Sequence, residues 1–106
     1  MVENIDSIVK IIEDYLNALK RENIFVEKAY LFGSYAKGTA TVDSDIDLAV
    51  ISKDFVGNRF NDRMKIAPLR WNVDLRLEPV PYRPEDFKYP DPLAIDILEH
   101  GIEIKL

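Results

Sequence analysis

Apolar residues recur at helical spacing near the start of the chain. Seven of them lie three or four positions apart: Ile5, Ile8, Val9, Ile12, Tyr15, Leu16 and Leu19. This spacing places them on one face of a first α-helix, which we expect to end near Asn23 with Asp6 or Ser7 as its N-cap. Further helices are predicted over residues 59–69 and from Pro92 to His100, where Gly101 suits the C-terminal end.

Strand-like patterns alternate with these helices. Short runs rich in Val, Ile, Leu, Tyr and Phe are bounded by Gly, Ser, Thr and Asp, and the run before Asp74 alternates apolar with charged residues. Four prolines between residues 78 and 91 predict an extended surface segment rather than a strand. We expect strands over residues 26–32, 46–51 and 72–77, a short edge strand over 102–106 and a helical turn over 34–37.

The order of these elements predicts an α/β (α+β) fold. Helix, strand, helical turn, strand, helix, strand and helix follow one another, which is typical of a small mixed sheet with helices mainly on one face. A length of 106 residues corresponds to a single domain spanning residues 1–106. The longest apolar runs are far shorter than the roughly 20 residues of a membrane span, and no signal-peptide pattern opens the chain. A cytoplasmic protein is therefore expected.

Composition excludes several kinds of chemistry. The chain has no cysteine, which rules out disulfides, thiolate zinc sites and cysteine nucleophiles. His100 is the only histidine, so any serine–histidine triad would depend on it. The net charge of −5 argues against general nucleic-acid binding, because that affinity comes from clustered Lys and Arg. A local basic pocket for a triphosphate remains compatible with this charge.

Three aspartates in or beside apolar strands are the candidate catalytic residues. Asp45 and Asp47 are two positions apart at the start of a predicted strand, so their side chains point to the same face. Asp74 lies in the next predicted strand. Clustered carboxylates need neutralisation, and Mg²⁺ commonly binds through one or two carboxylates and substrate phosphates. If the two strands are neighbours, the three aspartates converge into a site suited to two metal ions.

A glycine–serine turn supplies a candidate phosphate site. Gly33 and Ser34 follow a strand and open a helical turn, so backbone N–H groups can approach an anion closely. Lys37 lies one turn further on and is a candidate for reaching the triphosphate. Arg76 shares the expected face of Asp74, either as a phosphate clamp or as a charge partner of the aspartates. The Gly-Lys-Ser/Thr of a Walker loop is absent.

Together these motifs resemble a known family. Gly33-Ser34, ten intervening residues and then Asp45-Ile46-Asp47 resemble the signature of the DNA polymerase β-like nucleotidyltransferase superfamily. With Gly38 and Ser44 the string resembles the minimal nucleotidyltransferases, the MNT group. Asp74 in Val73-Asp74-Leu75 matches the third carboxylate of the family, and residues 92–101 resemble its C-terminal helix and turn. The resemblance covers most of the chain.

The resemblance implies Mg²⁺-dependent transfer of AMP from ATP to a hydroxyl group. Asp45, Asp47 and Asp74 would hold two Mg²⁺ ions, and Asp74 would help to deprotonate the acceptor. Many minimal nucleotidyltransferases are antitoxins that adenylylate a tyrosine of a HEPN-domain toxin, so the expected activity is that of a protein adenylyltransferase. Two alternatives stay open: an antitoxin that acts by binding alone, and an enzyme that nucleotidylates a small molecule such as an aminoglycoside.

The partner is expected to supply the acceptor surface. One domain of this size builds a shallow site, so a second chain, either a HEPN toxin or another copy of this protein, has to complete it. The segment from Pro79 to Pro92 is the predicted docking strip, with Tyr82, Phe87 and Tyr89 exposed on a stiff backbone. For Phe60, Trp71 and also Tyr82 the sequence leaves two interpretations, core or partner surface.

Overall fold

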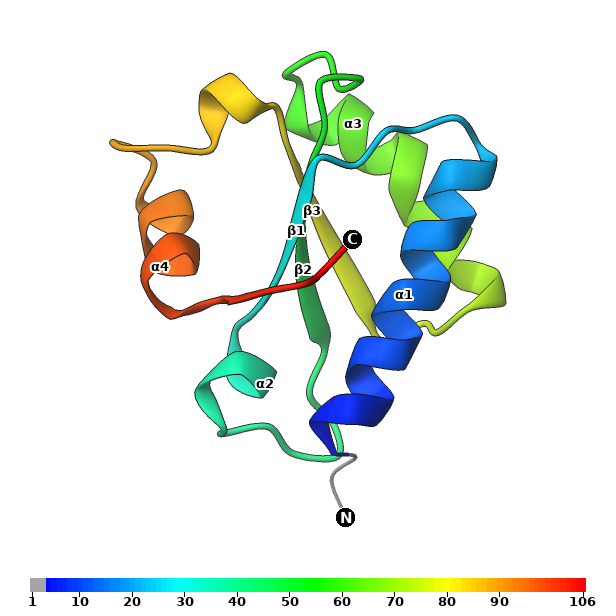
Figure 1. Cartoon of the computed structure of the whole chain (residues 1–106), viewed down its shortest axis with the longest axis vertical. Helices are drawn as coiled ribbons and strands as arrows, with labels where there is room; N and C mark the ends of the chain where they lie inside the picture. The colour runs from blue at the N-terminus through cyan, green and yellow to red at the C-terminus, as the bar shows by residue number, and fades with distance from the viewer. Residues whose placement is uncertain (1–3) are drawn as a thin grey trace.

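One mixed sheet forms the centre of the molecule (Figure 1). The computed structural model describes residues 4–106, and within them the strands are β1 (Lys28–Phe32), β2 (Ile46–Ile51), β3 (Leu77–Tyr82) and β4 (Ile102–Glu103), in the order β3-β2-β1-β4. Strand β1 pairs antiparallel with β2 and β4, whereas β2 pairs parallel with β3. The predicted mixed sheet and short final edge strand are confirmed.

Helices cover both faces of this sheet, with most of the helical residues on one side (Figure 1). Helices α1 (Ile5–Arg21) and α3 (Arg59–Ile66) lie on one face, and α4 (Pro92–His100) lies on the other. The remaining helical segments are short: α2 (Ser34–Lys37), η1 (Ala67–Asn72) and η2 (Pro84–Asp86), the last two being 3₁₀ turns. Among the described residues, no helix combines the length and apolar character needed to cross a lipid bilayer.

Helix α1 forms as its apolar spacing predicts. Ile8, Ile12, Tyr15 and Leu19 are fully buried against the sheet. The Tyr15 hydroxyl donates to the Ile66 carbonyl oxygen at 2.7 Å, which joins α1 to the end of α3. The predicted N-cap was wrong: Asn4 accepts the Ser7 N–H at 2.9 Å, and Asp6 lies in the first helical turn. Asparagine serves as well as serine or aspartate at this position.

Alternation along the strands builds two cores. Residues such as Leu31, Leu48 and Leu77 pack under α1 and α3, whereas Tyr30, Ala49 and Ile51 face α4. Because successive side chains of a strand point to opposite faces, Asp47 and Glu78 project on the α4 side of the sheet.

The third strand lies five residues later than predicted. We expected a strand over residues 72–77 and an extended surface segment after it, but β3 spans Leu77–Tyr82. It includes Pro79 and Pro81, which an edge strand tolerates. The carbonyl oxygens of Arg76 and Tyr82 accept hydrogen bonds from Ile46 of β2 and from Ser52 just after it. Even-numbered residues of β3 therefore direct their backbone groups toward β2. Pro79 and Pro81 alternate with them and turn their nitrogen atoms to the outer edge of the sheet. A proline-rich sequence therefore forms a regular strand here.

The predicted docking strip is largely internal. The Tyr82 side chain is 3% exposed and belongs to the core under α4. Phe87 packs against it, with ring centroids 5.0 Å apart, and against Tyr30 at 5.3 Å. Only Tyr89, at 79% exposure, stands out from the surface as expected. The prediction was wrong for Tyr82 and Phe87 because β3 and η2 fold this segment back onto the sheet.

Candidate active site

Gly33 and Asp47 are in direct contact where β1 ends. Strand pairing sets Phe32 opposite Asp47, so the next residue, Gly33, passes the Asp47 carboxylate. A Cβ atom at Gly33 would collide with Asp47 Oδ2. Gly33 also has a φ of 73°, in the left-handed region that favours glycine, and it is the N-cap of α2. The turn therefore requires glycine for two reasons, backbone conformation and the proximity of a carboxylate.

Asp45 and Asp47 form an electrostatically coupled pair. Asp45 is exposed just before β2, and Asp47 is partly buried inside it. Burial, the Asp45 carboxylate and the Glu78 carboxylate together raise the pKa of Asp47 from 3.8 to about 6. The site therefore disfavours the ionised form of the Asp47 carboxyl group unless a cation compensates for its charge. Two hard oxygen donors with this electrostatic need fit Mg²⁺, which binds through one or two carboxylates plus phosphate oxygens.

Glu78 is a carboxylate of this site that the sequence analysis missed. The parallel register places it directly opposite Asp47. Arg63 of α3 donates to Glu78 Oε2 and Arg70 of η1 donates to Oε1, both at 2.9 Å. Burial acts to raise the pKa of Glu78, but the two arginine hydrogen bonds outweigh it and the net shift is downward. The signal in the sequence was a single charged residue, Glu78, among the apolar residues of 77–82, which the prolines of the same strand obscured.

Asp74 lies in a turn before β3, so the prediction that it belongs to a strand was wrong. Its carboxylate accepts the Arg76 backbone N–H at 2.9 Å, a local bond that favours a turn over an extended strand. The Arg76 guanidinium donates to both carboxylate oxygens, at 3.0 and 2.8 Å. These bonds hold the pKa of Asp74 below its ordinary value. Of the two interpretations of Arg76, the structure supports the charge partner.

The three aspartates do not converge as predicted. Within residues 4–106, no group of three Asp, Glu or His side chains is arranged closely enough to enclose a metal ion. Asp47 contacts Gly33 at the start of α2, and the Asp45 carboxylate is near enough to raise the pKa of Asp47, whereas the Asp74 carboxylate bonds to Arg76. The turn of Asp74 is nevertheless fixed beside β2, because Ile46 N–H donates to the Arg76 carbonyl oxygen at 2.8 Å.

Lys37 ends α2 and is half-exposed. Its Nζ lies 3.8 Å from Asp96 Oδ2 of α4, and Asp96 Oδ1 lies 3.2 Å from His100 Nδ1. Lys37 therefore connects α2 with α4 in this structure. Its predicted contact with a triphosphate stays a prediction.

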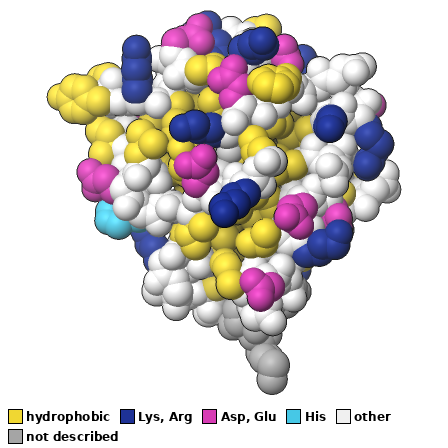
Figure 2. Space-filling model, viewed as in Figure 1, with side chains coloured by type: hydrophobic (Ala, Val, Ile, Leu, Met, Phe, Trp, Pro, Cys, Tyr) yellow, Lys and Arg dark blue, Asp and Glu magenta, His cyan; other side chains and the backbone are white. Residues whose placement is uncertain are grey.

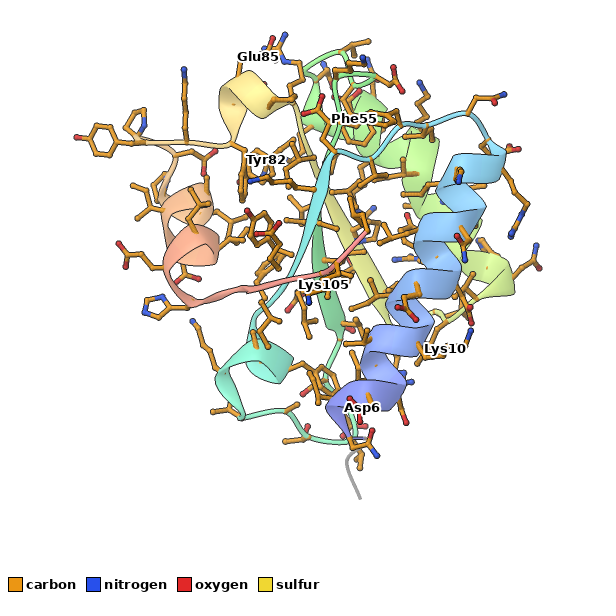
Figure 3. All side chains as sticks on the ribbon, in the orientation of Figure 1. Asp6, Lys10, Phe55, Tyr82, Glu85 and Lys105 are labelled. Atoms are coloured by element: carbon orange, nitrogen blue, oxygen red, sulfur yellow. The ribbon has the colours of Figure 1, made fainter. Side chains whose placement is uncertain are left out.

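A groove of about 520 Å³ lies at the other end of the sheet. Its lining includes Arg59, Tyr82, Glu85 and Asp91, and none of the predicted site residues belongs to it. Tyr82 pairs with Ile51 at the end of β2, four residues beyond Asp47, which corresponds to roughly 13 Å along a strand. Figure 3 shows Tyr82 and Glu85 at the upper end, away from α2. The groove is therefore separate from the Gly33–Asp47 site.

Surface charge gives no sign of a broad basic face in the view of Figure 2. Lys and Arg side chains are interspersed there with Asp and Glu, and apolar side chains lie between them. Any anion recognition on this face would therefore be local.

The paired aspartates beside a glycine–serine turn are matched by a family profile. The profile described as nucleotidyltransferase domain matches residues 12–104. The chain belongs to this nucleotidyltransferase family.

Relatives of this nucleotidyltransferase domain include a curated enzyme. The chain is 42% identical over 67 residues to the protein adenylyltransferase MntA of Shewanella oneidensis, covering 59% of this chain and 48% of that protein. It thus spans about half the length of the curated relative it matches.

Solved structures of the same fold are also similar. A nucleotidyltransferase of Sulfolobus solfataricus superposes with a TM-score of 0.66 at 16% identity, over 92% of this chain and 78% of that one. A toxin–antitoxin structure with AMP-PNP superposes with a TM-score of 0.61 at 28% identity, over 88% of this chain and 72% of that one. A mutant of the toxin–antitoxin MntA–HpeT superposes with a TM-score of 0.64 at 23% identity, over 88% of this chain and 71% of that one. These likenesses confirm the predicted nucleotidyltransferase core.

Proposed function

We propose that this protein is a Mg²⁺-dependent adenylyltransferase that transfers AMP from ATP to a tyrosine hydroxyl of a HEPN-domain toxin partner and thereby acts as its antitoxin. The observation that carries the proposal is the contact between the Asp47 carboxylate and Gly33 at the start of α2. It brings the Asp45–Asp47 pair and the Gly33-Ser34 turn into one site. The similarity to MntA and to a toxin–antitoxin structure with AMP-PNP supports the nature of the reaction and of the partner.

Each part of the site has a role in this proposal. Asp45 and Asp47 would hold Mg²⁺, which when bound neutralises the triphosphate and the charge that develops during transfer. The first N–H groups of α2 lack helical acceptors, so those after Gly33 would bind a phosphate oxygen, with the Ser34 hydroxyl beside them. Glu78 lies opposite Asp47 and would be the third carboxylate once bound Mg²⁺ draws it from Arg63 and Arg70, because residues 4–106 hold no group of three acidic side chains already in place. Asp74 is a weak base in its bond with Arg76, which removes the argument for its role in deprotonating the acceptor.

The alternative of a catalytically silent antitoxin finds less support. Loss of catalysis usually leaves a missing carboxylate or a changed glycine–serine turn, and here Gly33, Ser34, Asp45 and Asp47 are all present and adjacent.

Substitution of the two competing third carboxylates will decide between them. We expect Glu78→Gln to lower the transfer rate about 100-fold, equivalent to about 3 kcal/mol of transition-state stabilisation. Asp74→Asn should lower it less than about 10-fold, because Asp74 precedes β3 and the strand register sets Glu78, not Asp74, opposite Asp47. Single-turnover kinetics with radiolabelled ATP would measure both variants, with thermal melting as a control for folding. The reverse order of effects would restore Asp74 as the third carboxylate.

The acceptor can be tested directly. The purified protein is mixed with the product of the neighbouring gene, ATP and Mg²⁺, and intact-mass spectrometry is used to look for added AMP. We expect AMP on a tyrosine of the toxin, and none when EDTA replaces Mg²⁺ or when Asp45 and Asp47 are both changed to Asn. An unmodified toxin together with efficient nucleotidylation of an aminoglycoside would contradict the proposal and favour a small-molecule acceptor.

A further inference from the structure

A row of large apolar side chains is exposed on the outside of α3 and η1. Phe60 is 72% exposed, Met64 54% and Trp71 71%, and Pro68 between them is exposed as well. We refer to these four residues as the α3–η1 stripe. Apolar patches of this kind on monomeric proteins often mark interaction sites, whereas single scattered residues do not.

The backbone makes the stripe continuous. Residues four apart on an α-helix lie on the same side, which aligns Phe60 and Met64 on α3, and Pro68 follows in the first turn of η1. From Ala67 the chain continues as a 3₁₀ helix, in which residues three apart align, and this places Trp71 over Pro68. The two helical geometries together extend one apolar row along the whole segment.

The opposite side of α3 already has its partners. Ile66 is fully buried under α1, and Asp62 is 4% exposed. The Asp62 carboxylate accepts the N–H groups of Val56 and Gly57, each at 2.9 Å. Folding of the domain therefore explains the inner face of α3 but gives no role to the stripe.

Basic residues border the stripe. Arg59 precedes Phe60 and Lys65 follows Met64. Residues 59–76 carry five Lys and Arg against two Asp, while the other 88 residues carry nine Lys and Arg against 17 Asp and Glu. Three of the five cations are paired with carboxylates, Arg63 and Arg70 with Glu78 and Arg76 with Asp74. Lys65 and the half-exposed Arg59, 4.0 Å from Asp91, are therefore the basic residues that border the stripe.

We propose that the α3–η1 stripe is the docking surface for the toxin partner, which would present an apolar helical patch bordered by carboxylates. This inference rests on the proposed function, because it assigns a surface to the partner named there. The spacing of Phe60, Met64 and Trp71 fits helix-on-helix recognition. Two aromatic side chains bury roughly 150–250 Å² each, which is a substantial part of the roughly 800 Å² that a stable interface takes from one partner.

A second copy of this chain fits the stripe less well. Symmetric pairing of two stripes would bring Arg59 and Lys65 of one copy towards the same basic residues of the other, which costs affinity. An acidic border on a different protein satisfies the same charges. The docked partner would also lie next to Arg63, which is on α3 and bonds to Glu78 of the candidate active site.

The test is calorimetric titration of the HEPN-domain partner of the proposed function, without ATP, into four forms of the protein. These are wild type, Met64→Glu, the double variant Phe60→Glu/Met64→Glu, and Leu98→Glu as a matched control on α4, where Leu98 is 51% exposed. We expect Met64→Glu to weaken binding at least about 30-fold, as for a central interface residue, the double variant to abolish it and Leu98→Glu to leave it unchanged. Unchanged melting temperatures would show that each variant is folded.

The other outcomes contradict the inference in distinguishable ways. Wild-type affinity in both stripe variants would show that the stripe is not the docking surface and would leave the proposed function intact. No binding by the wild-type protein would refute the partner itself, and with it both proposals. Light scattering without toxin adds a third outcome: a wild-type dimer that Met64→Glu dissociates would assign the stripe to a second copy of this chain.

Discussion

Asp47→Asn is expected to reduce nucleotidyl transfer by about 1,000-fold or more, corresponding to roughly 4 kcal/mol of lost transition-state stabilisation. Asp47 contacts the glycine turn and interacts electrostatically with both Asp45 and Glu78. Asparagine has nearly the same shape but cannot supply the negative charge. Steady-state transfer assays measure the effect, and Asp43→Asn, an exposed aspartate of the same loop, is the matched control. Equal losses in both variants would contradict a specific role for Asp47.

The same substitution should stabilise the metal-free protein. The pKa of Asp47 is about 6 in the folded state against an ordinary 3.8, so folding favours the protonated carboxyl. The ionised group therefore costs stability progressively between pH 4 and 6, and the full cost is present above pH 6. Because the side chain is partly solvated, we expect Asp47→Asn to raise the free energy of unfolding by the order of 1 kcal/mol at pH 7.5, with little gain at pH 4.

Urea unfolding at the two pH values measures this difference. Adding Mg²⁺ should stabilise the wild-type protein more than the variant, because a ligand stabilises the form that binds it. A variant that is less stable than wild type at pH 7.5 would instead point to a structural role of the carboxylate.

Gly33→Ala is expected to abolish transfer and to destabilise the fold by roughly 2–4 kcal/mol, from left-handed backbone strain and steric conflict together. The new Cβ would occupy the position of Asp47 Oδ2, so the carboxylate would have to rotate away from the α2 turn. Chemical denaturation and transfer assays measure the two effects.

Gly38→Ala is the matched control for this prediction. Gly38 has nearly the same φ, 75° against 73°, but its ψ of 19° lies in the left-handed helical region that other residues tolerate better than the ψ of −148° at Gly33, and no atom lies within 4 Å of its added Cβ. We expect a loss of only about 1 kcal/mol and near-normal transfer, because strain is present without the collision. If the two alanine variants behaved alike, the contact with Asp47 would have no functional weight.

Local patterns in the sequence predicted most of the elements correctly. Helix α1 follows from apolar residues at helical spacing, and α4 from Pro92 and Gly101 at its ends. Strand β2 and the helical turn after Gly33 also lie where the residues indicate. In each case the decisive interactions are between residues close in sequence, such as the cap of α4, where Asp91 accepts the Ala94 N–H at 3.0 Å.

What the sequence did not reveal depends on contacts between distant segments. Proline indicates a loop on its own, yet Pro79 and Pro81 are compatible with β3 because that strand lies at the edge of the sheet. The parallel pairing with β2 then sets Glu78, and not Asp74, opposite Asp47. No pattern within the sequence of β3 fixes which of its residues faces Asp47.

The candidate site also divides into local features that the sequence predicts and features that depend on contacts between distant segments. Asp45, Asp47, Gly33 and Ser34 were identifiable from sequence because strand alternation and a glycine turn are local properties. The exposure of Phe60 and Trp71 was not, since an apolar residue is core or surface only according to what the rest of the chain places against it. Sequence by itself determined the candidate residues, the paired aspartates and the glycine–serine turn, and tertiary structure decided that Glu78 lies opposite Asp47 and that the α3–η1 stripe is exposed.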